Sequence, residues 1–180
     1  MLYASIIILI ILIIIAVLMS SVIIGLIRTR GVPFISTNKK DFKQILAAVD
    51  LKTNEKIYDL GCGKASLLIL AAQKYGAKGV GYELSLWPYL WAKFNSWKSR
   101  ADVDVYLKDF FTADLSDADV VFCYLFTHIM GRLEQKFERE MKPGSRVVAY
   151  GFKLPHRQPV KEIITNDDNV ELGKIYVYRY

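Results

Sequence analysis

A glycine-containing turn follows a short apolar run near the middle of the chain. The run is Lys56–Leu60, and the turn contains Gly61 and Gly63, with Asp59 two residues ahead of the first glycine. Glycines permit a tight turn and let a ligand approach the backbone closely. In doubly wound sheets, ligands bind at such strand-to-helix turns, outside the carboxyl ends of the strands. The pattern therefore predicts a binding site for a small ligand.

Two further carboxylates are placed to complete this site. Glu83 ends the second apolar run, where a carboxylate can accept hydrogen bonds from ribose hydroxyls, and Asp109 follows the third run, where an acid can face an adenine edge. A dinucleotide fingerprint would need glycine or alanine at Ser66, so NAD is the weaker alternative. Asp59 would repel a pyrophosphate but attract an amino group. A nucleoside with a cationic amino-acid tail, such as S-adenosylmethionine, therefore fits better.

Alternating strands and helices must position these residues. Such alternation predicts an α/β fold with a doubly wound, mainly parallel seven-stranded sheet that ends in a C-terminal hairpin. Strands are expected at Lys56–Leu60, Gly79–Glu83, Val103–Leu107, Asp119–Leu125, Arg146–Gly151, Val160–Thr165 and Lys174–Tyr180. Helices are expected at Ala65–Tyr75, from the cap Ser85 to about Ser99, and at Arg132–Met141.

The N-terminal part of the chain has a different composition from the rest. The 180 residues include 24 basic and 18 acidic ones, and none of these precedes Arg28. Leu2–Ile27 is apolar for long enough to cross a bilayer, and its uncharged start favours an uncleaved anchor over a signal peptide. The expected organisation is a transmembrane anchor at 1–27, a juxtamembrane segment and leading helix at 28–50, and a ligand-binding domain at 51–180.

Charge gives the expected orientation and excludes other partners. Arg28, Arg30 and Lys39 lie close to the apolar run, and basic flanks mark the cytoplasmic side, so the N-terminus is expected outside. The lipid bilayer is therefore an expected partner. The net charge of +6 is modest and no arginine-rich arm is present, so no nucleic-acid partner is expected. Two cysteines suggest neither a disulfide framework nor a metal site.

The loop and the acids that follow it resemble those of class I S-adenosylmethionine-dependent methyltransferases. The resemblance implies that the loop holds the methionine end of the cofactor and that the acid after the second strand holds its ribose. Lys64 and Ala65 depart from the family pattern. The cofactor-binding residues implied are Asp59, Leu60, Gly61, Cys62, Gly63, Glu83, Leu84, Asp109 and Phe110.

A narrower set of motifs resembles the single-span protein-lysine methyltransferases typified by the enzyme that acts on the ATP synthase c subunit, and their prokaryotic relatives. The motifs are Gly31–Thr37, Tyr82–Leu84, Pro143–Val148, Leu154–Pro155 and Gln158–Val160. This resemblance implies methylation of an accessible lysine on a membrane-associated protein. It also implies a prokaryotic cell membrane, or a mitochondrial membrane in a eukaryote. Ser36 and Asn38 stand where relatives often have proline.

Aromatic residues are the catalytic candidates. A lysine must lose its proton before it accepts a methyl group, and an apolar pocket favours the neutral amine. Aromatic faces also attract a nearby cation. Tyr124 and Phe34 are the catalytic residues expected, with Phe126 as a further aromatic candidate, whereas His128 and His156 are expected to be surface residues.

Other interpretations stay open on the sequence alone. A lipid or quinone acceptor would explain the apolar run equally well. A catalytically silent cofactor-binding module is suggested by Lys64 and Ala65. Trp87, Trp91 and Phe94 recur at i, i+4 and i+7 of one expected helix, a spacing that favours packing in the core.

Overall fold

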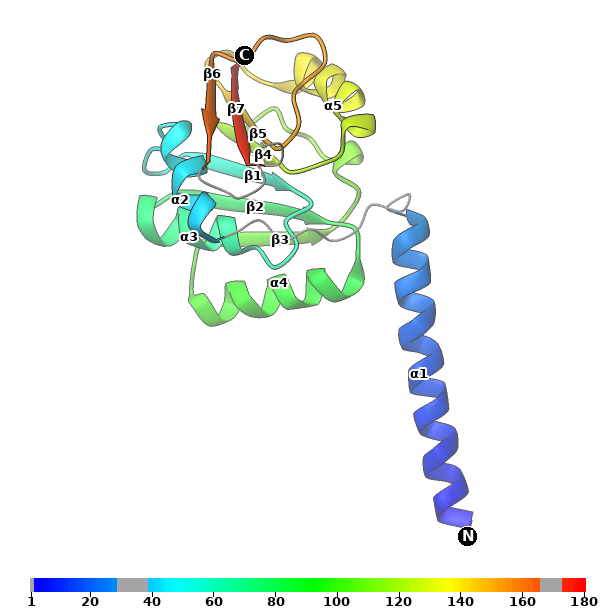
Figure 1. Cartoon of the computed structure of the whole chain (residues 1–180). Helices are drawn as coiled ribbons and strands as arrows, with labels where there is room; N and C mark the ends of the chain where they lie inside the picture. Colours follow the sequence, from blue (N-terminus) through cyan, green and yellow to red (C-terminus); the bar gives the residue numbers. More distant parts are fainter. Residues whose placement is uncertain (1, 29–38, 166–172) are drawn as a thin grey trace.

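The computed structural model describes residues 2–28, 39–165 and 173–180 (Figure 1). The described residues form one seven-stranded sheet with the strand order β3-β2-β1-β4-β5-β7-β6. The strands are β1 (Lys56–Leu60), β2 (Lys78–Glu83), β3 (Val103–Leu107), β4 (Val120–Cys123), β5 (Arg146–Tyr150), β6 (Lys161–Ile164) and β7 (Lys174–Arg179). Strands β1 to β5 pair in parallel, and β7 pairs antiparallel with both β5 and β6. The predicted fold and its terminal hairpin are confirmed.

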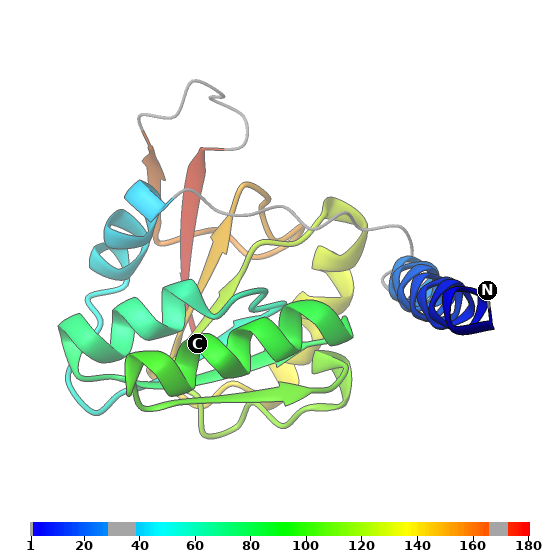
Figure 2. The ribbon, with the colours of Figure 1, turned by 90° about the horizontal axis from the view of Figure 1, so that it is seen from below.

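Helices cover both faces of the sheet (Figure 2). Helices α2 (Lys39–Ala48), α3 (Ser66–Tyr75) and α4 (Leu86–Ser99) contribute to one buried cluster, and α5 (Thr127–Glu140) contributes to the other. Alternate residues of one strand serve the two clusters, as Ile57 and Tyr58 do in β1. This alternation follows from the two-residue period of a strand, and it fixes which strand side chains face the site.

Two element boundaries differ from the sequence prediction by more than one residue. Strand β4 ends at Cys123, so the residues from Tyr124 onward leave the sheet and lead into the next helix. Helix α5 begins at Thr127 rather than at Arg132. The start of this helix contains Thr127 and Gly131, residue types with low helix propensity, and this hid it from the sequence pattern. The remaining strands of the parallel part lie within one residue of their expected positions.

The N-terminal helix α1 (Leu2–Arg28) was expected to be a transmembrane anchor. Its described apolar side chains are exposed, among them Ile7, Leu9 and Leu12. Across the described residues, no helix meets both the length and the hydrophobicity required to span a bilayer. The membrane-spanning assignment of residues 1–27 therefore has no support from the structure.

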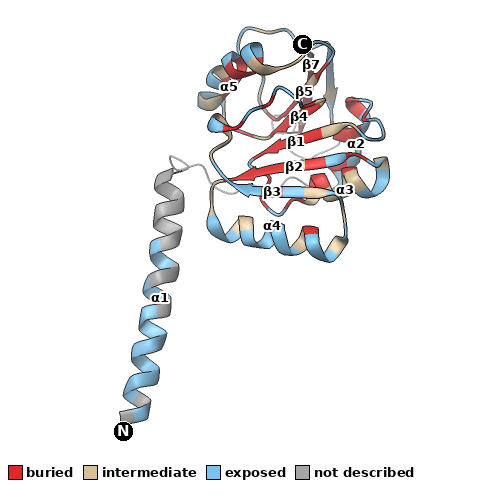
Figure 3. Ribbon diagram, turned by 180° about the vertical axis from the view of Figure 1, so that it is seen from behind, coloured by how far each residue is buried: buried red, intermediate tan, exposed pale blue. Residues whose placement is uncertain are grey.

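Helix α4 reverses the orientation that its sequence suggested. Trp87, Trp91 and Phe94 are 48%, 57% and 53% exposed, whereas the buried side chains of the helix are Ala92 and Ser96. The interpretation of the three aromatic residues as core is wrong. Figure 3 shows the outer side of α4 as largely exposed. The fully buried side chains of this helix are therefore its small ones.

Candidate cofactor and acceptor site

The loop after β1 folds back over the end of β2. The N–H groups of Gly61 and Cys62 both donate to the Tyr82 carbonyl, at 2.9 and 3.0 Å. Gly61 and Gly63 have φ of 89° and 54°, and Ala65 has φ of 58°, all in the left-handed region. Ala65 thus adopts the backbone conformation that favours glycine, at a cost of about 1–2 kcal/mol. The departure from the usual glycine leaves the loop geometry intact.

Glu83 is held by three backbone donors at the end of β2. One carboxylate oxygen accepts from the Gly63 N–H at 3.0 Å, and the other accepts from the N–H groups of Leu84 and Ser85 at 2.9 and 2.8 Å. The residue is 7% exposed. Burial raises the pKa of Glu83, and the three backbone hydrogen bonds oppose that rise. The carboxylate is therefore fixed beside the glycine loop, ready to accept further donors.

Asp59 is a second buried carboxyl group at the same place. Burial, followed by the charge of Glu83, raises the pKa of Asp59 to about 8. None of the hydrogen bonds found among the described residues involves its carboxylate. A buried acid of this kind is stabilised in its charged form by a cationic or N–H ligand. Asp59 therefore fits the amino group of a bound molecule.

Residues after β3 complete this edge of the sheet. The Lys108 N–H donates to the Glu83 carbonyl at 3.0 Å, which brings the end of β3 beside that of β2. Asp109 accepts from the Phe111 N–H at 2.9 Å and caps a short 3₁₀ helix, η1 (Phe110–Thr112). The carboxyl ends of β1, β2 and β3 thus bring together every residue that was expected to bind the cofactor. Their individual contacts with a cofactor remain predictions.

Gly81 is a site residue that the sequence analysis did not single out. A Cβ at this position would lie 2.7 Å from the Cys62 sulfur and 3.0 Å from a methyl carbon of Leu68. A side chain there would force Cys62 or Leu68 to shift. Its position between Gly79 and Glu83 in the second strand was the only signal in the sequence.

Aromatic side chains form two pairs near the carboxyl ends of β4 and β5. Tyr124 packs edge-on against Tyr150, with 4.9 Å between the ring centroids. The Tyr150 hydroxyl donates to the buried carboxylate of Asp41 on α2 at 2.8 Å. Phe126 lies 5.7 Å from Phe152, again between ring centroids. The expected catalytic residue Tyr124 thus forms an aromatic wall with Tyr150. The Phe126–Phe152 pair is separate from it, since Tyr124 packs against one buried cluster and Phe152 against the other. The sequence analysis did not single out Tyr150 or Asp41.

Two further expectations concern single residues. Phe34 lies outside the described residues. His128 is exposed and stacks on Phe126, with 6.2 Å between ring centroids, as the surface expectation requires.

The arrangement fits S-adenosylmethionine by its chemistry. A cationic amino group matches the buried Asp59, ribose hydroxyls match the anchored Glu83, and the glycine loop admits a ligand to its backbone. The dinucleotide alternative fits less well, because Asp59 would place a buried acid near a pyrophosphate.

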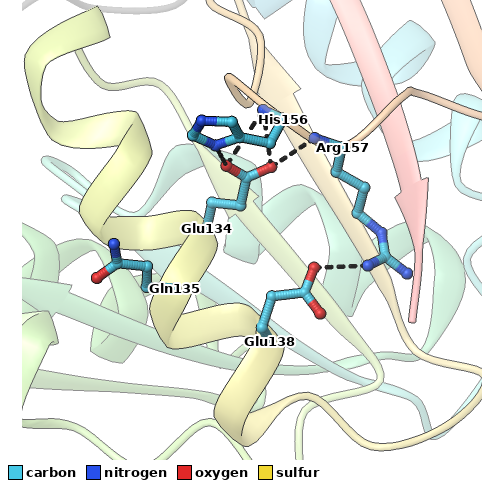
Figure 4. Close-up of a pocket in the computed structure, with 5 residues that line it drawn as sticks. All are labelled: Glu134, Gln135, Glu138, His156 and Arg157. Carbon is cyan, nitrogen blue, oxygen red and sulfur yellow. Dashed lines mark hydrogen bonds and ion pairs between the residues drawn. The ribbon is translucent and has the colours of Figure 1, made fainter.

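A separate hollow lies between α5 and the segment that follows β5 (Figure 4). Its volume is about 440 Å³, and it is lined by Glu134, Gln135, Glu138, His156 and Arg157. The Glu134 carboxylate accepts from the His156 and Arg157 N–H groups at 3.1 and 2.6 Å, and Arg157 donates to Glu138 at 2.6 Å. These acids fasten the segment to α5. The hollow is therefore part of the scaffold and not of the cofactor site.

Comparison with known proteins gives a consistent family. The family described as the ANTKMT methyltransferase domain matches residues 59–161. A protein-lysine N-methyltransferase of Saccharolobus islandicus is 32% identical over 150 residues, which cover 82% of this chain and 92% of that protein. The human lysine N-methyltransferase of the ATP synthase c subunit is 28% identical over 130 residues, 71% of this chain and 55% of that protein.

One solved structure matches over nearly its whole length. It is an RNA methyltransferase from Salinibacter ruber in complex with S-adenosyl-L-homocysteine. The TM-score is 0.75 with 27% sequence identity, and the match covers 81% of this chain and 93% of that one. The fold and the cofactor class agree with the geometry of the site.

Proposed function

This chain belongs to the ANTKMT methyltransferase domain family and is a class I S-adenosylmethionine-dependent methyltransferase, and we propose that it methylates lysine side chains of proteins. The similarity to a protein-lysine N-methyltransferase over 82% of the chain carries the choice of acceptor. The similarity to the lysine methyltransferases of ATP synthase in human and of adenine nucleotide translocase in mouse agrees with it.

The chain's own residues divide the work of binding. When bound, S-adenosylmethionine supplies a methyl group on a sulfonium, which is reactive toward a neutral amine. Asp59 binds the amino group of the cofactor, and Glu83 accepts the ribose hydroxyls while Gly63, Leu84 and Ser85 hold its carboxylate in place. This anchoring means that little side-chain entropy is lost at Glu83 on binding.

The aromatic wall prepares the acceptor. A lysine that packs against Tyr124 leaves water, and its loss of hydration favours the neutral amine that can accept a methyl group. The ring faces attract the positive charge that the nitrogen gains when it accepts the methyl group. Tyr124 is oriented by Tyr150, which Asp41 holds through a hydrogen bond. The wall therefore positions and dehydrates the nucleophile, which is the main task of the protein in such a transfer.

We also propose that the enzyme works at a membrane on a membrane-associated substrate. The uncharged apolar run at 2–27 and the exposed described side chains of α1 support attachment, and the basic residues that follow support a cytoplasmic catalytic domain. Extraction of the membrane fraction with alkaline carbonate tests this directly. The chain should stay with the lipid pellet, and its release would contradict attachment through α1.

The acceptor class is tested with methyl-labelled S-adenosylmethionine, the full-length protein and its own membranes. The products are separated into protein, extractable lipid and RNA. We expect label in a discrete protein band, released as methyl-lysine on hydrolysis, and none with Gly61→Arg. Label confined to lipid would assign the enzyme to a lipid or quinone acceptor. Cofactor binding without any label would favour a silent module.

A further inference from the structure

Helix α4 presents a large apolar surface to its surroundings. The side chains on this surface are between 45% and 76% exposed. They are Leu86, Trp87, Leu90, Trp91, Phe94 and Trp97, and we refer to them as the α4 apolar face. Their spacing along the helix places them on the side opposite the buried Ala92 and Ser96. Figure 3 shows the outer side of α4 as largely exposed.

This orientation is the reverse of that of an ordinary surface helix. Such a helix turns its apolar stripe toward the core and its polar residues toward water. A contiguous exposed apolar patch marks a surface that meets a partner or a membrane. All three tryptophans of the chain lie on this one face. The α4 apolar face therefore has the character of a docking surface.

Basic side chains surround the face. Lys93 and Lys98 lie on the helix, and Arg100 follows its end. Lys64 of the cofactor loop reaches over the Trp91 ring, with its nitrogen 5.4 Å from the ring centroid. Helix α4 itself contains no acidic residue. The rim of the face is therefore positively charged.

We propose that the α4 apolar face docks on an anionic lipid bilayer. Tryptophan is enriched at the membrane–water boundary, where its amphipathic ring sits at the level of the headgroups. Basic residues near the surface are attracted to anionic lipids, and a helix with one apolar and one basic region lies in the plane of that interface. Docking of a second copy would instead bring two positively charged rims together.

Docking of α4 also places the cofactor site. The Asn95 side-chain amide donates to the Lys64 carbonyl at 3.1 Å, and Lys64 meets Trp91, so the helix is joined to the glycine loop. The same helix begins three residues after Glu83. A docked α4 therefore holds the cofactor loop close to the lipid surface. This consequence rests on the proposed function, in that it would favour lysines at the membrane surface of a substrate protein.

Tryptophan fluorescence tests the proposal without a label, because every tryptophan of the chain lies on α4. The full-length protein is reconstituted into vesicles that contain phosphatidylglycerol with brominated acyl chains, which quench tryptophans in contact with them. We expect about a two-fold fall in emission relative to unbrominated vesicles, because the rings sit at the headgroup–acyl boundary. The double variant Leu90→Glu/Phe94→Glu keeps all three tryptophans and should lose the quenching.

A matched control adds the same charge elsewhere. Val160 is 62% exposed and lies before β6, far along the sheet from α4, so Val160→Glu should leave the quenching unchanged. Unquenched emission from wild-type protein that floats with the vesicles would overturn docking of α4, while attachment through α1 and methyl transfer would both stand. A blue shift of the tryptophan emission that grows with the protein-to-lipid ratio, and is equal in brominated and unbrominated vesicles, would assign the face to a second copy. That result would also overturn the proposal. The wild-type result decides the matter even if the double variant fails to fold.

Discussion

Replacement of Gly81 by alanine tests whether the loop after β1 is the cofactor site. The added Cβ would lie 2.7 Å from the Cys62 sulfur and 3.0 Å from Leu68, well inside van der Waals contact. The Cys62 sulfur could rotate away, but the Cys62 Cβ, 3.0 Å from the added carbon, is held by the backbone, whose N–H is bound to the Tyr82 carbonyl at 3.0 Å. Either the loop or the end of β2 must move.

The size of the effect follows from two costs. Overpacking of a filled site costs about 1–3 kcal/mol. A shifted loop also weakens the hydrogen bond from the Gly63 N–H to Glu83, and a bond to a charged group contributes about 1.5–3 kcal/mol. Only part of this free-energy cost falls on cofactor binding, and the rest lowers the stability of the fold. We therefore expect Gly81→Ala to weaken binding of S-adenosylhomocysteine by about 10- to 100-fold.

Titration calorimetry with the full-length protein measures the change. Gly131→Ala is the matched control, because its Cβ would lie 3.7 Å from Pro155 in ordinary contact, on α5 and outside the loop after β1. Adding Cys62→Ala to Gly81→Ala removes the closest overlap and should restore part of the affinity. Binding by Gly81→Ala within about two-fold of wild type would refute the reasoning, because the overlap is then not transmitted to the site.

Other predictions concern the carboxylates and the aromatic wall. Glu83→Ala should weaken S-adenosylhomocysteine binding by about 1–3 kcal/mol in calorimetry through lost charge-assisted hydrogen bonds, and unchanged affinity would remove Glu83 from the site. Binding at pH 7 should release protons, because Asp59, with a pKa of about 8 in the free protein, ionises beside the ligand's ammonium. Calorimetry in buffers of different ionisation enthalpy measures that release, and Asp59→Asn should abolish it. Burial raises the pKa of Asp59 from 3.8 to about 8. The free energy of unfolding of the wild type, relative to that of Asp59→Asn, should therefore fall as the pH rises across that interval and level off above it. Denaturant unfolding that shows no such trend would contradict the burial argument. Glu134→Ala should lower the free energy of unfolding by about 1–3 kcal/mol, since it leaves the Arg157 N–H without its acceptor, and an unchanged urea midpoint would argue against that role. Tyr124→Ala should lower turnover far more than cofactor affinity, whereas loss of affinity alone would place Tyr124 in the cofactor pocket.

Features encoded locally could be predicted from the sequence. The strand, the glycine turn and the acid at the end of the next strand lie within one stretch of the chain, and the structure places Asp59, Gly61 and Glu83 together at one edge of the sheet. Parallel pairing brings the carboxyl ends of neighbouring strands together, so the order of motifs was sufficient for this part.

Features that depend on long-range packing could not be predicted. The contact between Asp41 and Tyr150 joins residues 109 positions apart, and no local pattern marks it. The spacing of Trp87, Trp91 and Phe94 identifies a stripe on a helix but not the side to which that stripe turns. The small residues Ala92 and Ser96 settle the direction, because they allow α4 to approach the domain closely.

The most direct test of the central claim compares lysine methylation in cells with and without this chain. Peptide mass spectrometry of the membrane fraction should show at least one methylated lysine that disappears when the chain is removed. The wild-type chain should restore it and Gly61→Arg should not. An unchanged set of methylated lysines, together with a methylated lipid that depends on the chain, would contradict lysine as the acceptor.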